Sequence, residues 1–161
     1  MRYEEKTKKE RGLWLLSVIL TIAVILATFY FSSQDATKST LQSRGLVRWV
    51  LNLLRLDFTA AEFARYNRVA RKMAHFILYF LLGCGLTGCF YRRKSFAAVF
   101  QVVPLGALFA AMDELHQAFT EGRGPGIGDV VLDTSAVLTA YLLLYLFARL
   151  VRRIRGILRR V

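Results

Sequence analysis

One 22-residue stretch holds most of the groups in this chain that could do chemistry. Residues 112–133 read MDELHQAFTEGRGPGIGDVVLD and contain five carboxylates, one histidine and one arginine. Carboxylates and imidazole can bind divalent cations and transfer protons, and a guanidinium beside a glycine-rich loop can bind phosphate. The sequence on both sides is almost purely apolar, so acidic groups collect at the junction of two apolar segments.

Three side chains are candidates for acid–base catalysis. His75 lies at the start of one apolar run, and Asp113 and Glu114 directly follow another. Asp129 and Asp133 are one helical turn apart and could hold a divalent cation. Ionisable groups inside a membrane cost free energy unless they are paired or hydrated. Each such group therefore suggests a functional site by default.

A second set of polar residues could bind a ligand around these groups. Lys72, His75 and Tyr79 recur at helical spacing and therefore share one face of a helix. Gln117 follows Asp113 by one turn, and a glycine-rich loop follows both. The candidates for ligand binding from these patterns are Lys72, Tyr79, His116, Gln117 and Arg123.

A purely structural interpretation of the same groups stays open. Carboxylates near Arg71, Lys72 and Arg123 could form ion pairs that only fix helix packing. A lone histidine in a membrane helix is often a hydrogen-bonded packing residue. Convergence of several such groups from three helices favours a site, because carboxylates so close together need a cation, a proton or an arginine between them.

Four apolar runs predict the helices that position these groups. They cover residues 13–31, 74–91, 96–112 and 130–148, and each has at most one ionisable group besides tyrosine and cysteine. At about 1.5 Å per residue, runs of this length span roughly 26–29 Å, the thickness of a bilayer core. We therefore expect an all-α, polytopic membrane protein with four transmembrane helices, forming a single domain over residues 1–161.

The segment between the first two runs predicts an additional, amphipathic helix. Its apolar residues recur at i, i+3, i+4, i+7 and i+8, namely Leu46, Trp49, Val50, Leu53 and Leu54. This apolar face could lie on the outer membrane surface or pack onto the bundle, and the spacing fits both. The sequence TAAE at residues 59–62 matches a capping box and predicts the start of the long helix that carries His75.

Basic residues predict the orientation of the chain. The N-terminal segment, the connection at residues 92–94 and the C-terminal tail fall on one face and hold 14 Lys and Arg, against nine on the other. The positive-inside rule then places both termini in the cytoplasm and the acidic stretch on the outer side. The basic tail directly follows a membrane span, which favours anionic lipid as its partner and not nucleic acid.

Three motifs at these positions resemble the VanZ-like family of small bacterial membrane proteins. They are FSSQ at the end of the first run, RKMAHFILYFLLG leading the second, and DELHQAFTEGRGPGIGDVVLDT from residue 113 onward. The resemblance covers nearly the whole chain, as one VanZ-like membrane domain. The family often has Asn where this chain has Asp133, so this position departs from the pattern.

The resemblance implies a protein of the bacterial cytoplasmic membrane associated with lowered susceptibility to glycopeptide antibiotics such as teicoplanin. It adds Ser33 and Gln34 to the candidates for ligand binding. One open function is binding or remodelling of a membrane lipid, a lipid-linked cell-wall precursor or a lipoglycopeptide. The other is an intramembrane enzyme that acts on a lipid headgroup. The sequence identifies neither a cofactor nor a particular metal, and no inverted repeat favours a transporter.

Overall fold

The computed structural model describes residues 2–90, 96–124 and 126–158, and every regular element in these ranges is helical. The elements are α1 (Arg2–Ser32), α2 (Ala36–Leu53), α3 (Ala60–Phe90), a short 3-10 helix η2 (Phe96–Ala98), α4 (Val99–Ala118) and α5 (Ile127–Leu158). The basic connection at residues 92–94 and the last two arginines of the tail lie outside the described residues.

Four helical segments are long and apolar enough to cross a membrane. They are Glu10–Ser32, Ala60–Phe90, Phe96–Ala118 and Ile127–Leu158. Each contains one of the four apolar runs, except that residue 91 is outside the described part of the chain. A helix satisfies its own backbone hydrogen bonds, as the interior of a bilayer requires. The prediction of an all-α protein with four transmembrane helices is therefore confirmed.

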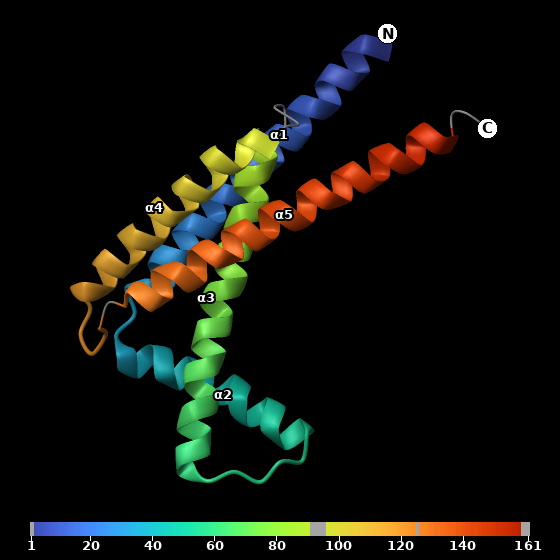
Figure 1. Cartoon of the computed structure of the whole chain (residues 1–161). Coiled ribbons are helices and arrows are strands. Elements are labelled where there is room, and N and C mark those ends of the chain that lie inside the picture. Colours follow the sequence, from blue (N-terminus) through green and yellow to red (C-terminus); the bar gives the residue numbers. More distant parts are fainter. Residues whose placement is uncertain (1, 91–95, 125, 159–161) are drawn as a thin grey trace.

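The four long helices form one bundle with the smaller α2 at one end (Figure 1). α3 packs against both α1 and α5, and α5 packs against α4. The two termini lie at one end of the bundle, and α2 and the α4–α5 connection lie at the other (Figure 1). The side chains of α2 and of this connection therefore lie far from the basic ends of the chain.

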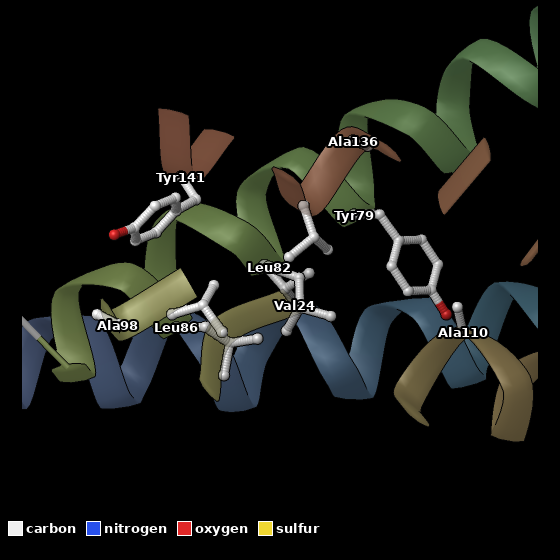
Figure 2. Packing of buried hydrophobic residues seen from close by; sticks show 10 residues of the cluster. Val24, Tyr79, Leu82, Leu86, Ala98, Ala110, Ala136 and Tyr141 are labelled. Atoms are coloured by element: carbon white, nitrogen blue, oxygen red, sulfur yellow. The ribbon is translucent and has the colours of Figure 1, made fainter. Parts of the chain in front are cut away.

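The centre of the bundle is built from a few buried side chains. Figure 2 shows Leu82 and Leu86 of α3 beside Val24 of α1, and the Tyr79 ring directed at α4 near Ala110. Most other apolar side chains of the four long helices point outward. Such exposure suits transmembrane helices, because lipid tails are themselves apolar.

Glycines allow the helices of this bundle to approach closely. A Cβ atom added to Gly83 would lie 2.9 Å from the Val137 Cα of α5, and one added to Gly106 would lie 2.7 Å from the Val137 side chain. A Cβ on Gly85 would collide with Thr21 of α1. Small residues at these positions therefore set the spacing of α3 from α1 and α5, and of α4 from α5.

The predicted amphipathic helix is α2, and the side chains of its predicted apolar face are exposed. Trp49 and Leu53 are 63% and 66% exposed, whereas Val47 and Leu51 on another side of the helix are buried. The Asp35 side chain caps the helix by accepting a hydrogen bond from the Lys38 amide at 2.7 Å. Of the two alternatives for this face, the arrangement favours contact with the membrane surface.

The capping box at the start of α3 is confirmed. The Thr59 amide donates to Glu62 Oε2 at 2.8 Å, and the Glu62 amide donates to Thr59 Oγ1 at 3.3 Å. The helix begins at Ala60 and continues without interruption into the membrane-spanning part. His75 therefore lies on the same continuous helix as the capped N-terminal turn.

The glycine packing gives a first testable prediction. Gly83→Ala should lower the free energy of unfolding by roughly 1–3 kcal/mol, because the added methyl meets backbone atoms that cannot move aside easily. Thermal unfolding of the purified protein in detergent measures the loss. Gly45→Ala is the matched control, since nothing lies within 4 Å of its added Cβ. Equal melting temperatures for Gly83→Ala and the parent would contradict the close packing of α3 on α5.

Candidate functional site

His75, Asp113 and Asp133 meet inside the bundle, each from a different helix. His75 Nδ1 lies 3.7 Å from Asp133 Oδ2 and 4.0 Å from Asp113 Oδ2. Both aspartates are fully buried, and the histidine side chain is 23% exposed. The three long helices α3, α4 and α5 thus bring two acid–base candidates and one cation-binding candidate to a single point.

The two aspartates have few hydrogen-bond donors around them. Asp113 Oδ2 accepts a hydrogen bond from Gln117 Nε2 at 2.8 Å. Asp113 Oδ1 and both carboxylate oxygens of Asp133 have no hydrogen-bond partner among the described residues. Buried polar groups in proteins are nearly always satisfied, so three such oxygens in one place indicate that a proton or a cation belongs there.

A cavity of about 650 Å³ opens beside this cluster. Its wall includes His75, Asp133, Glu114 and Gln117, together with polar side chains of α2. Four cationic residues line the same cavity, namely Arg68, Arg71, Lys72 and Arg123. Apolar side chains complete it, among them Phe31, Leu46, Ile77, Leu78 and Leu132. The lining therefore suits a molecule with a charged part and an apolar part.

Two guanidinium groups in this cavity have unused hydrogen-bonding capacity. The Nε atoms of Arg71 and Arg123 are buried and donate no hydrogen bond to any described residue. Arg123 Nη2 donates to the Phe31 carbonyl at the end of α1, at 3.1 Å. Burial lowers the pKa of Arg123, and the positive charge of Arg71 lowers it further. A guanidinium nevertheless stays protonated at neutral pH, so an anion would stabilise this pair.

Asp129 has a different partner from the one that its spacing suggested. Lys72 Nζ lies 2.6 Å from Asp129 Oδ1 and joins α3 to α5. Both side chains are partly exposed, so the pair contributes little stability. Asp129 is not among the three residues whose possible ligand atoms lie within 4.8 Å of one another, so its role as a cation ligand stays a prediction. The residues that could hold a metal are His75, Asp113 and Asp133.

Glu114 lines the cavity but faces the loop between α4 and α5. Its Oε2 accepts a hydrogen bond from the Gly126 amide at 2.8 Å, directly before α5 begins. Gly122 in the same loop has φ of 72°, a conformation that favours glycine. Glu114 thus holds the connection that carries Arg123, and the structure does not place it against His75.

Four of the predicted ligand-binding residues lie outside the cavity. Tyr79 is buried in the core, and its hydroxyl donates to the Phe109 carbonyl at 3.3 Å (Figure 2). Ser33, Gln34 and His116 line a separate hollow of about 410 Å³. The prediction grouped residues by their positions along the helices, whereas the side chains of these four face other neighbours. Lys72, Gln117 and Arg123 do line the main cavity.

Sequence reasoning missed the contribution of α2 to the cavity. Ser39, Gln42, Ser43 and Leu46 all line it. Positions 39, 43 and 46 are spaced at four and three residues, so they share one helix face, and this signal was available in the sequence. Only the fold shows that this face turns toward α3.

The site lies in a part of the chain that matches the model of a known protein family. This family model is described as VanZ/LLP1 and matches residues 17–148, which include the whole cluster and the whole cavity lining. No curated protein and no solved structure gives a significant match.

The hydrogen bond between Gln117 and Asp113 gives a second prediction. Gln117→Leu should lower the free energy of unfolding by about 1–3 kcal/mol, because it removes the described donor to a buried carboxylate. Thermal unfolding in detergent at neutral pH measures the effect. Glu121→Gln, at an exposed position of the neighbouring loop, serves as the control. A Gln117→Leu protein as stable as the parent would mean that Asp113 obtains its hydrogen bond elsewhere.

Proposed function

Because the chain belongs to the VanZ/LLP1 family, we propose that it is a bacterial cell-envelope protein that lowers susceptibility to glycopeptide antibiotics, teicoplanin among them. The proposed mode of action is binding of an anionic amphiphile in the cavity between α2, α3 and α5. A lipid-linked cell-wall precursor and a lipid-tailed glycopeptide both have this chemistry. The observation that carries the proposal is the pair of buried, unused guanidinium Nε atoms in a cavity that also has apolar walls.

The cationic side chains of the cavity support an anionic headgroup as the ligand. Of the four, only Lys72 forms an ion pair within the part of the chain that is described. Arg71 and Arg123 retain donors that match the paired oxygens of a phosphate or carboxylate. Their partial burial strengthens such contacts, because water competes less for the anion.

The apolar part of the wall supports a ligand with a hydrocarbon chain. Ile77 of α3 lines the cavity and is 53% exposed, so the cavity has an accessible apolar edge on this helix. A chain attached to the bound headgroup could therefore remain in the bilayer beside this helix. Each buried methylene contributes about 0.8 kcal/mol, so a tailed ligand would be concentrated at the cavity relative to an untailed one.

The proposed location is the outer leaflet of the bacterial cytoplasmic membrane. The cavity is lined by parts of α2, the α4–α5 connection and neighbouring helix segments, and α2 and this connection lie at the end of the bundle opposite the two termini (Figure 1). The excess of basic residues at the terminal end, 14 against nine, favours a cytoplasmic position for that end. The cavity would then open on the side where glycopeptides meet cell-wall precursors.

An intramembrane enzyme acting on a lipid headgroup is the second candidate. The specific observation in its favour is that His75 lines the cavity with the Asp133 carboxylate 3.7 Å from its ring. A carboxylate beside an imidazole can stabilise the positive charge that the imidazole acquires when it acts as a general base. Purified protein incubated with phosphate-containing lipids distinguishes the two functions. Headgroup release that is lost in His75→Gln would establish the enzyme.

The proposed orientation is tested by labelling single cysteines in whole cells, after replacement of Cys84 and Cys89 by alanine. Cysteines introduced at Thr37 in α2 and at Gly124 in the α4–α5 loop should react with a membrane-impermeant reagent. A cysteine at Gly156 near the end of α5 should react only after the cells are opened. The opposite pattern would place the cavity on the cytoplasmic side and remove the basis for the proposed action.

The proposed function is tested by antibiotic susceptibility in a sensitive Gram-positive host. Expression should raise the inhibitory concentration of a lipid-tailed glycopeptide more than that of an untailed one. Arg71→Gln should lose most of this protection, because a hydrogen bond to a charged group contributes about 1.5–3 kcal/mol, or roughly tenfold or more in affinity. Arg65→Gln, an exposed arginine of the same helix outside the cavity, should protect like the parent.

Two results would contradict this proposal at equal membrane abundance. Full protection by Arg71→Gln would mean that the cavity does not bind the relevant anion through this residue. Equal protection against tailed and untailed drugs would mean that the hydrocarbon chain has no part in recognition.

A further inference from the structure

Three side chains of the kinds that bind metals converge in the interior of the bundle. His75, Asp113 and Asp133 each present a ligand atom, and these atoms lie within 4.8 Å of one another. Three atoms so spaced share a centre no more than about 2.8 Å from each of them. That distance is a small side-chain adjustment from the roughly 2.0–2.6 Å of bonds between divalent cations and nitrogen or oxygen ligands.

Three of the four carboxylate oxygens at this point have no hydrogen-bond partner among the described residues, although both aspartates are completely buried. Asp133 makes no hydrogen bond through either oxygen, and Asp113 makes none through Oδ1, within the described ranges. His75 Nδ1 is 3.7 and 4.0 Å from the nearest carboxylate oxygens, too far for a direct hydrogen bond. Two uncompensated carboxylates in the interior would be strongly destabilising.

No lysine or arginine among the described residues forms an ion pair with Asp113 or Asp133. Lys72 Nζ contacts Asp129 at 2.6 Å, on the neighbouring turn of α5. Arg123 Nη2 is directed to the Phe31 carbonyl. Arg123 acts on Asp113 only at longer range, so the charge closest to both carboxylates is a proton, as on His75, or an ion bound among the three residues.

We propose that His75, Asp113 and Asp133 bind one divalent transition-metal cation, such as Mn²⁺ or Zn²⁺, through a nitrogen and two carboxylate ligands. The mixture of ligands decides the class of ion. Imidazole favours first-row transition metals, and carboxylate oxygen is acceptable to both Mn²⁺ and Zn²⁺, whereas Mg²⁺ and Ca²⁺ prefer all-oxygen sites.

Gln117 acts on this site through Asp113. Its Nε2 donates to Asp113 Oδ2 at 2.8 Å and also lies 3.4 Å from Ser32 Oγ at the end of α1. This contact fixes the orientation of one carboxylate and leaves its Oδ1 available to the ion. Hydrogen bonds that orient a ligand in this way commonly change metal affinity by roughly 10- to 100-fold.

The ion would have coordination positions open to the cavity. His75 and Asp133 line the cavity wall, whereas Asp113 lies behind them. Three protein ligands leave a transition metal at least one free position, which an anionic headgroup oxygen could occupy beside Arg71 and Arg123. This role toward a headgroup rests on the proposed function, but the binding of the ion does not.

Metal titration of the purified full-length protein in detergent, after treatment with a chelator, tests the site. Mn²⁺ binding is followed by the electron paramagnetic resonance signal of the free ion, and Zn²⁺ binding by calorimetry. We expect saturable binding of one ion per chain for at least one metal. Asp133→Asn should weaken the binding by about 100-fold or more, since it removes a charged ligand and not only an orienting contact.

Two matched variants control for charge and for histidine content. Asp129→Asn removes a carboxylate one turn away on the same helix. It should leave affinity within about threefold of the parent, because water and salt screen the field of a partly exposed charge. His116→Gln removes the other histidine, which lies in the separate hollow, and should also bind like the parent.

Thermal unfolding keeps the test valid if a variant is less stable. Bound metal should raise the melting temperature of the parent and of Asp129→Asn, but not that of Asp133→Asn. Absence of saturable binding of both ions to the parent would overturn the proposal and assign the balancing charge to a proton. Undiminished binding by Asp133→Asn would overturn it as well. Arg71→Gln should still bind the ion, so failure of the metal site is distinguishable from failure of the proposed function.

Discussion

The complete burial of two aspartates, Asp113 and Asp133, is the constraint on which the rest of this bundle depends. Each comes from a different helix, and a third helix supplies His75 between them. Carboxylates so placed are tolerated only where their charge is balanced and their oxygens are bound. The neighbouring contacts serve this need in part, since Gln117 joins Asp113 to the end of α1. The ends of α1, α4 and α5 and the middle of α3 are thereby fixed around one polar point.

Close packing deeper in the bundle makes this meeting possible. Gly83 lies two helical turns beyond His75 on α3, and Val137, which it contacts, lies one turn beyond Asp133 on α5. A larger side chain at Gly83 would separate the two helices at this crossing and carry the imidazole away from the carboxylate. The small residues of the apolar core and the polar cluster are thus parts of one arrangement. The close packing at the small residues determines the distances between the side chains of the polar cluster.

The helix α2 borders the cavity and also exposes apolar side chains. One side of it contributes Ser39 and Ser43 to the cavity wall, and another exposes Trp49 and Leu53. A helix with these two faces can rest on lipid while it borders a binding site. The cavity therefore has a polar floor at His75 and Asp133 and an edge of α2 that is suited to contact with the bilayer. This placement agrees with a ligand that is itself part of the membrane.

The sequence by itself determined the elements and the depth of each polar group. Within a bilayer, a long uncharged run satisfies its backbone hydrogen bonds by forming a helix that spans the membrane. The capping box at Thr59 and Glu62 marks where one helix begins. Position along such a helix fixes depth, so His75, Asp113 and Asp133 were recognisable as neighbours in depth. The depth of a residue does not determine the direction in which its side chain points, however. Which groups face each other depends on how the helices are rotated and packed, and this is set by contacts between residues far apart in the chain. Only the tertiary structure therefore decided that Asp129 pairs with Lys72, that Tyr79 enters the core, and that His116 lies in another hollow.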